Sequence, residues 1–311
     1  MTAVSQPEPG AGPAAGPAAG APDAGEAAAV TPGWRLALRE FAANRAAVSG
    51  VAVLLFFILF CFLGPLLHPT DQVDTALLAT NQPPGAVHPL GTDAYGFDVL
   101  GRIMLGGRTS LEIGLLAAVL ATVIGTLWGA VAGLLGGLAD AAMMRVVDIL
   151  LALPFLLIVL IIAHRYGSNV WNLALILGVF SWLVPARLVR GEVLTLRVRD
   201  FVSAARVMGA GRAYLITRHL IPNALGVVLV NVTFQIADAI LALAALGFLG
   251  FGVHYPRTDW GSQISDAAEN LSNGYWWLVF PVGTALVLVV MAFNLIGDGL
   301  RDAVDVRLRR R

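Results

Sequence analysis

The chain has 311 residues, of which 58% are hydrophobic and 13% are charged, and its formal net charge is zero. Soluble domains are usually about 45–50% apolar and about 25% charged, so this composition excludes an ordinary soluble protein and indicates a membrane protein. All 20 basic residues are arginine. Without lysine the chain can build neither a nucleotide-binding P-loop nor a Schiff-base enzyme.

The N-terminal segment differs in composition from the rest of the chain. Residues 1–33 are mostly alanine, glycine and proline. Such a segment buries too little apolar surface to offset its ordering entropy, so we expect a disordered tail. It also lacks the basic region of a signal peptide. Residues 34–45 are basic and amphipathic, which predicts an interfacial helix at the start of a transmembrane domain covering residues 34–311.

Six apolar runs are long enough to cross a bilayer, which takes about 20 residues. Backbone groups in lipid must be satisfied within the segment, so these runs must be helices, and they are too long for barrel strands. The sequence therefore predicts an all-α membrane protein with six transmembrane helices, and Cys61 is expected to be a buried, inert thiol. The expected spans cover residues 48–67, 110–135, 146–163, 170–189, 224–249 and 276–297.

The arginines predict the orientation of the chain. With the N-terminus inside, sixteen arginines fall on that side of the membrane and four on the other. An excess of basic residues marks the cytoplasmic side. We therefore expect the N- and C-termini and residues 190–222 to be cytoplasmic, and the loops 68–109 and 250–275 to be extracytoplasmic.

A stripe of small residues runs along the second expected span. Gly125, Gly129 and Gly133 recur at four-residue spacing, with Ala121 one turn earlier. Such a stripe lets another helix approach closely. Two interpretations are open, namely helix packing within the bundle and an interface with another subunit.

The stretch "DFVSAARVMGAGRAYLITRHLIPN" begins at Asp200 and separates two apolar runs. We expect Asp200 to cap a short helix at 201–208, which Gly209 and Gly211 end because glycine readily adopts left-handed backbone angles. A second helix is expected from about residue 212 to 220, stopped by Pro222.

The expected product is a helix–turn–helix elbow on the cytoplasmic surface. Ala204 and Ala205 present almost no side chain, which lets the first helix enter a groove on another protein. Arg206 and the neighbouring arginines keep the elbow in the aqueous interface. The pattern favours a docking element that transmits movement to the membrane helices.

This stretch resembles the "EAA" loop of ABC importer permeases, in which Glu-Ala-Ala is followed by a glycine and then a proline. The corresponding residues are Ser203, Ala204, Ala205, Gly209 and Pro222, so serine stands in place of the glutamate.

Three further segments resemble the C-type permeases of dipeptide, oligopeptide and nickel importers. They are "HPLGTDAYGFDVLGRIMLGGRTSLEIG" (88–114), "LGFLGFGVHYPRTDWGSQI" (246–264) and "FNLIGDGLRDAVDVRLR" (293–309). The resemblance covers residues 34–309. Phe97, Leu243 and Val306 stand where that family usually has Arg, Glu and Pro.

The resemblance implies a type I ABC importer permease fold in the bacterial inner membrane. It implies a subunit that forms half of a translocation pathway for dipeptides or oligopeptides, with a nickel chelate or another small solute as the alternative cargo. The implied partners are a second homologous permease, two cytoplasmic ATPases, an extracytoplasmic binding protein and membrane lipid, with no nucleic acid. The chain would need no cofactor, since ATP and Mg²⁺ bind the ATPases.

The fifth expected span carries polar side chains. Because such side chains are energetically costly within lipid, they indicate a structural or functional role. Asn231, Gln235 and Asp238 fall at i, i+4 and i+7, on one helical face. We expect this face to line the pathway or the facing permease, and the alternative is a polar seam that joins helices. Asp148, three residues after Arg145, is expected to form a local ion pair with it.

The sequence argues against two other function classes. A membrane-embedded enzyme, such as a phosphotransferase using Asp298, Asp302 and Asp305, would need a nucleophile or metal cluster. The sequence has neither HExxH nor GxSxG, and these three acids fit a solvated helix end. A channel-forming oligomer would need a filter sequence, which is also missing. No pair of histidines has metal-ligand spacing, so we expect no metal site and no catalytic residue. The five histidines are His68, His88, His164, His219 and His254.

Overall fold

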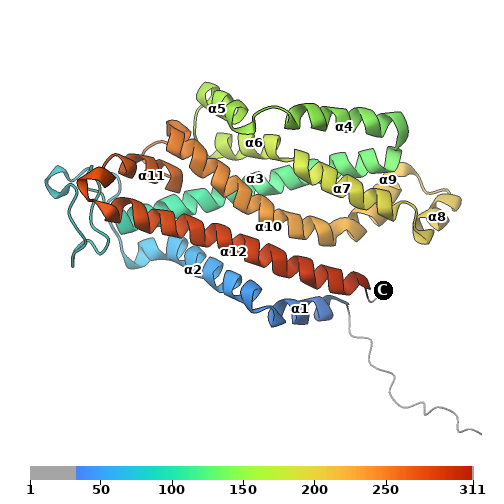
Figure 1. The fold of residues 1–311 in the computed structure, drawn as a ribbon, viewed down its shortest axis with the longest axis horizontal. Coiled ribbons are helices and arrows are strands. Elements are labelled where there is room, and N and C mark those ends of the chain that lie inside the picture. Colours follow the sequence, from blue (N-terminus) through green and yellow to red (C-terminus); the bar gives the residue numbers. More distant parts are fainter. Residues whose placement is uncertain (1–32, 310–311) are drawn as a thin grey trace, which may run out of the picture. The chain divides into compact units, whose positions relative to one another are not determined.

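A computed structural model describes residues 33–309, and all regular elements in that range are helices (Figure 1). The predicted N-terminal tail therefore lies, except for Gly33, outside the described residues. The main helices are α1 (Gly33–Ala43), α2 (Arg45–Leu67), α3 (Val99–Leu135), α4 (Gly137–Leu151), α5 (Phe155–Tyr166), α6 (Val170–Ser181), α7 (Leu183–Leu196), α8 (Asp200–Val207), α9 (Arg212–Tyr214), α10 (Ile221–Leu246), α11 (Trp260–Ala268) and α12 (Trp276–Arg309).

Four shorter segments complete the described part of the chain. Two are single 3₁₀ turns in loops, and two are π-helical stretches at the ends of α10. They are η1 (Leu77–Ala79), η2 (Leu215–Leu220), η3 (Gly247–Phe251) and η4 (Leu271–Asn273).

Four helical segments of the described chain are long and apolar enough to cross a membrane by themselves. They are Arg45–Leu67, Val99–Leu135, Arg212–Phe251 and Trp276–Val304. Two bent helix pairs, α4–α5 and α6–α7, bring the candidate spans to six if each pair is one span.

The third and fourth expected spans are broken helices, which is a correction to the continuous helices expected at 146–163 and 170–189. The axes of α4 and α5 differ by 79° and those of α6 and α7 by 42°. Pro154 lies within the first break, directly before α5, and proline both lacks an N–H and keeps the preceding residue out of the α-helical region. Pro185 follows the second break and cannot donate to the carbonyl oxygen of Ser181.

Helix α3 begins at Val99 rather than at residue 110, so residues 99–109 are not part of the expected loop at 68–109. Asp98 caps the helix, because its Oδ2 accepts a hydrogen bond from the Gly101 N–H at 2.8 Å. The extra turns are packed against α11, where the Trp260 indole N–H donates to the Ile103 carbonyl at 3.0 Å. Their glycines and arginines give them too little hydropathy to be recognised as part of a span.

The glycine stripe of α3 faces α7 of the same chain. A Cβ atom on Gly125 would lie 2.6 Å from the Cβ of Pro185, and one on Gly133 would lie 2.8 Å from the Cγ1 of Val193. At Gly129 the added atom would meet the carbonyl oxygen of Ala186. The stripe therefore lets two backbones approach closely within the bundle. Helix α7 leads directly to the segment predicted as the elbow.

The two ends of this helical unit carry different features. Figure 1 shows α8 and α9 at the same end as the C-terminal end of α12, with α11 and the loop before α3 at the opposite end. The long helices α3, α10 and α12 join these ends and pack against one another. Features at one end are therefore connected to the other end by continuous helices.

Candidate functional site

The first helix of the elbow ends in a Schellman motif. Gly209 has a left-handed φ of 86°. Its N–H donates to the Arg206 carbonyl at 3.0 Å, and the Ala210 N–H donates to the Ala205 carbonyl at 3.0 Å. This double closure turns the chain sharply. The expected cap at Asp200 is wrong by one residue, because Arg199 has the extended N-cap conformation and Asp200 starts the helix, where an acidic side chain complements the helix dipole.

Pro222 does not stop the second helix of the elbow, which is a further correction. The chain is helical without interruption from α9 through η2 into α10, and Pro222 lies in the first turn of α10. The Ile221 N–H reaches back to the Ile216 carbonyl, a bond of the wider π type. Proline disrupts an α-helix through its ring and its missing donor, and we infer that this wider turn accommodates both.

The elbow has a buried face and an exposed face. Val202 and Ala205 are buried in a cluster with Leu215 and Leu220 of the same elbow and with Val189 of α7. This packing fixes the elbow to the membrane helices.

The exposed face of the elbow carries apolar side chains at its tip. Val207 and Met208, next to Gly209, are 88% and 82% exposed. Ser203, Ala204 and Arg206 are exposed beside them.

Arginines of α7 hold the elbow end of the bundle together. Arg190 makes hydrogen bonds of 2.5 and 2.7 Å to the two carboxylate oxygens of Asp140 on α4. Arg187 pairs with Asp148 at 2.5 Å. The expected pairing of Asp148 with Arg145 is therefore wrong, because the broken α4–α5 pair brings α4 against α7.

Gln235 replaces a hydrogen bond that is missing at the break between α6 and α7. Its Nε2 donates to the Ser181 carbonyl at 3.3 Å, the same carbonyl that Pro185 leaves without its helical donor. Of the three polar residues that were predicted to share one face of this helix, Gln235 therefore has the position that the polar-seam interpretation predicts.

Asp238 and Asn231 are placed differently from Gln235. Asp238 is exposed and lines, with Gln235, a cavity of about 260 Å³ beside both helix breaks. Asn231 lines a separate cavity of about 350 Å³ with Phe234 and Arg301, and its Oδ1 is buried without a hydrogen-bond partner among the described residues. The three residues thus share a helix face but border two cavities.

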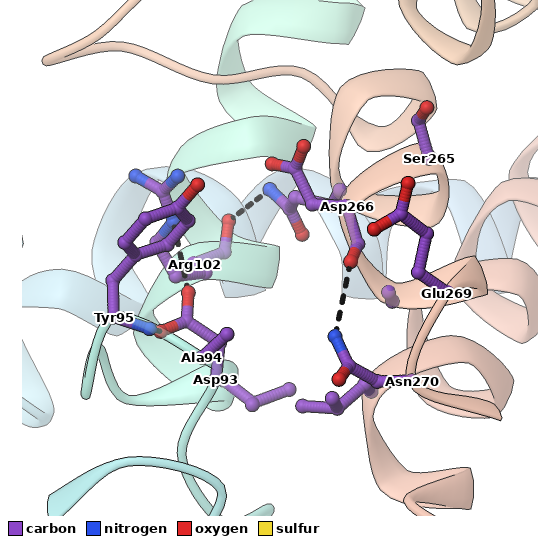
Figure 2. A pocket seen from close by; sticks show the side chains of 12 residues that line it. Asp93, Ala94, Tyr95, Arg102, Ser265, Asp266, Glu269 and Asn270 are labelled. Atoms are coloured by element: carbon purple, nitrogen blue, oxygen red, sulfur yellow. Dashed lines mark hydrogen bonds and ion pairs between the residues drawn. The ribbon is translucent and has the colours of Figure 1, made fainter. Parts of the chain in front are cut away.

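A third cavity lies at the end of the bundle opposite the elbow, between the start of α3 and α11 (Figure 2). Its volume is about 370 Å³. We call it the α3–α11 pocket and define it by Asp93, Tyr95, Arg102, Gln263, Asp266 and Glu269. Sequence reasoning did not find this pocket, because its walls come from two segments about 160 residues apart.

Two histidines at the same end converge on the cap of α3. His68 and His88 each hydrogen-bond to a different oxygen of the buried Asp98, at 3.2 and 3.0 Å. Their sequence spacing gave no sign of this contact. Among residues 33–309 no group of three or more His, Cys, Asp or Glu side chains is arranged to hold a metal ion.

Comparison with known proteins gives two matching family models. Residues 125–310 match the family model described as binding-protein-dependent transport system inner membrane component. Residues 33–84 match the N-terminal TM domain of oligopeptide transport permease C.

Two relatives cover most of the chain. The oligopeptide transport system permease protein OppC of Escherichia coli (strain K12) is 42% identical over 278 residues, which is 89% of this chain and 92% of that protein. The dipeptide transport system permease protein DppC of Bacillus subtilis (strain 168) is 38% identical over 274 residues, 88% of this chain and 86% of that protein. The chain therefore belongs to the family of binding-protein-dependent transport system inner membrane components and is a multi-pass membrane permease.

Proposed function

We propose that this chain is the transmembrane permease subunit of an ATP-driven peptide importer and forms half of its translocation pathway. The similarity to oligopeptide and dipeptide permeases along nearly the whole chain carries this proposal. We propose the partners of such an importer as well, namely a second homologous permease, two cytoplasmic ATPases and an extracytoplasmic binding protein. ATP and Mg²⁺ would bind the ATPases, and this chain would need no cofactor.

The elbow at 200–222 is the proposed contact with an ATPase. Shifting a two-state protein almost completely takes about 5.5 kcal/mol of differential stabilisation. A chain without lysine has no P-loop to supply it, so the energy must enter through a partner. The exposed tip at Val207 and Met208 supports docking, and the buried Val202 and Ala205 support transmission into α7 and α10.

This role fixes the proposed orientation. The elbow and the C-terminal end of α12 would be cytoplasmic, and α11 with the loop before α3 would face outward. The excess of arginine near the elbow end supports this arrangement.

The proposed pathway runs beside Gln235 and Asp238. Both border the two helix breaks, and discontinuous helices commonly form the substrate sites of transporters because their free backbone groups can bind a ligand. A peptide offers donors and acceptors; the amide of Gln235 can bind both, and the carboxylate of Asp238 can accept hydrogen bonds from the donors.

Gly209 and Gly211 provide a matched test of coupling. A side chain has open space at both positions, but only Gly209 has a positive φ, whereas Gly211 has a φ of −71°. A left-handed β-branched residue costs about 1–2 kcal/mol. In the reconstituted importer we expect Gly209→Val to lower peptide uptake per ATP hydrolysed severalfold, and Gly211→Val to behave like the wild type. Normal coupling in the Gly209 variant would refute the role of the elbow.

A further inference from the structure

The cavity that Asn231 borders lies between α7, α10 and α12, and we call it the Asn231–Arg301 cavity after its two polar side chains. Its volume is about 350 Å³, and its other lining side chains are apolar. Apolar walls with a few polar groups are the usual composition of a small-molecule site. The chemistry of the two polar side chains therefore indicates which kind of group the cavity can bind.

Packing of α12 against α10 fixes the place of Arg301. A Cβ atom on Gly297 would lie 2.6 Å from the hydroxyl oxygen of Thr233, and one on Gly226 would lie 3.0 Å from Val304 Cγ1. The two helices are thus in close contact on both sides of Arg301, which lies one helical turn after Gly297. The backbone that carries the guanidinium is therefore held beside the cavity that Arg301 lines.

Both accessible polar side-chain groups of the cavity are hydrogen-bond donors. Arg301 is exposed and makes no hydrogen bond or ion pair with the side chains that the structure describes. The amide nitrogen of Asn231 donates to none of them either, whereas Asn231 Oδ1, the only acceptor among the lining side chains, has no accessible surface and cannot meet an occupant. A guanidinium has donors and no acceptor. The cavity therefore favours an occupant with acceptor oxygens.

The charge of Arg301 makes an anion the best acceptor. Two carboxylates lie near it in the sequence of α12, those of Asp298 and Asp302, but neither lines the cavity. Asp302 Oδ2 instead accepts a hydrogen bond from the side-chain amide of Asn44 at 3.4 Å. Arginine binds carboxylate and phosphate groups through charge-assisted hydrogen bonds, which are stronger than neutral ones. These two groups are therefore the candidate occupants.

The position of the cavity along α10 favours the carboxylate. Asn231 precedes Gln235 by about one helical turn, on the face that also carries Asp238. In the proposed orientation α10 leads outward from the elbow, so Asn231 lies on the cytoplasmic side of Gln235. The cavity then borders the proposed pathway near its cytoplasmic end, where a transported peptide passes before its release.

We propose that the Asn231–Arg301 cavity binds the C-terminal carboxylate of the transported peptide, with Arg301 as its cationic partner and the Asn231 amide as a second donor. The C-terminal carboxyl group of a peptide is ionised at neutral pH whatever the sequence, so this contact recognises a C-terminus rather than particular side chains. The inference rests on the proposed function, which supplies the peptide and the orientation. The phosphate of an anionic lipid is the competing occupant, and the experiment distinguishes the two.

The experiment measures uptake by the complete importer in proteoliposomes of one peptide in two forms, as the C-terminal acid and as the C-terminal amide. Both forms are supplied at concentrations that saturate the binding protein, whose own preference cancels when the acid-to-amide uptake ratios of two variants are compared. We expect Arg301→Gln to lower this ratio about fivefold relative to the wild type, the effect of losing an exposed ion pair. Arg301→Lys keeps the charge and should retain most of the ratio.

Arg39→Gln is the matched control. It removes an exposed guanidinium from α1 that does not line the cavity, and it should leave the acid-to-amide ratio of the wild type unchanged. A change in this control as large as that in Arg301→Gln would show that the ratio reports overall charge rather than the cavity, and the inference would be lost.

Two further results would overturn the inference. A wild-type ratio in Arg301→Gln would exclude Arg301 as the partner of the carboxylate. Equal losses of acid and amide uptake that disappear when phosphatidylcholine replaces the anionic lipid would assign Arg301 to a lipid phosphate. In each of these cases, uptake of peptide by the wild type would leave the proposed function intact. The absence of ATP-dependent uptake of either form by the wild type would instead remove the proposed function itself.

Discussion

Arg190 on α7 donates hydrogen bonds to both carboxylate oxygens of Asp140 on α4, and the side chains of Arg190 and Asp140 are 33% and 11% exposed. Bidentate pairs of this kind are stronger than single contacts and specific to the planar guanidinium. The pair joins α4 to α7 at the end of the bundle that carries the elbow.

We expect Arg190→Lys to lower the stability of the purified protein by about 1–2 kcal/mol, because lysine cannot bind both oxygens and leaves Asp140 partly unpaired. The measurement is the thermal unfolding midpoint in detergent. Arg187→Lys is the control, since Arg187 and Asp148 are 50% and 47% exposed and exposed pairs contribute only about 0–1 kcal/mol. Equal losses in the two variants would contradict the importance of the bidentate contact.

Gly129 is predicted to be the most sensitive position of the stripe on α3. Its added Cβ would meet backbone atoms of α7, including the Arg190 nitrogen at 2.9 Å, and backbone cannot move aside as a side chain can. Gly129→Ala should therefore destabilise by about 1–3 kcal/mol through overpacking.

Gly191 on α7 provides the control for this substitution, because a Cβ there meets nothing within 4 Å. Gly191→Ala should be neutral or stabilise slightly, given the higher helix propensity of alanine. Thermal unfolding of both variants tests the prediction, and a tolerated alanine at Gly129 would mean that the two helices can separate without cost.

Asp238 is predicted to matter for transport rather than for assembly. It borders the cavity at both helix breaks, with no side-chain hydrogen bond among the described residues, so Asp238→Asn removes a charge without removing a contact. We expect peptide uptake to fall while the complex still assembles. Asp298→Asn, which removes an exposed charge of α12 that lines neither cavity, should transport normally. Unchanged uptake of all peptides by the Asp238 variant would exclude this residue from the pathway.

Asp259 is predicted to make stability depend on pH. It is fully buried, and burial raises its pKa, although hydrogen bonds from Val253 and Ser262 oppose the rise. The folded state then binds a proton at a higher pH than the unfolded state does, so stability is lost as pH rises through the folded-state pKa.

The unfolding midpoints of the wild type and Asp259→Asn at pH 4 and pH 7 test this sign. Between pH 4 and pH 7 the unfolding midpoint of the wild type should fall relative to that of the variant. If the wild-type midpoint rises relative to that of the variant instead, the hydrogen bonds from the Val253 N–H and from Ser262 outweigh the loss of solvent around Asp259.

The sequence predicted those features that depend on local chemistry. Long apolar runs must be helical in lipid, so the helical class followed from composition alone. The turn at Gly209 was also predictable, because few other residues adopt its backbone angles.

Features that depend on distant partners were not predictable in this way. Hydropathy did not separate α4 from α5, since the residues around Pro154 remain apolar through the break. Asp148 was assigned to its sequence neighbour because nothing local indicates Arg187. His68 and His88 meet on Asp98 only after the loop before α3 has folded.

The helical segment that begins at Arg212 continues to Leu249, where the left-handed Gly250 (φ 85°) introduces a kink, and it makes the elbow one end of a long, stiff helix. At 1.5 Å per residue the helix from Arg212 to Leu249 spans about 57 Å. A tilt of about 10° about its midpoint would move the two tips by about 5 Å in opposite directions, by the geometry of a straight helix. Such a rigid-body tilt needs no relay of side chains, and a displacement of the elbow at one face of the membrane would move the segment that leads into α11 at the other face.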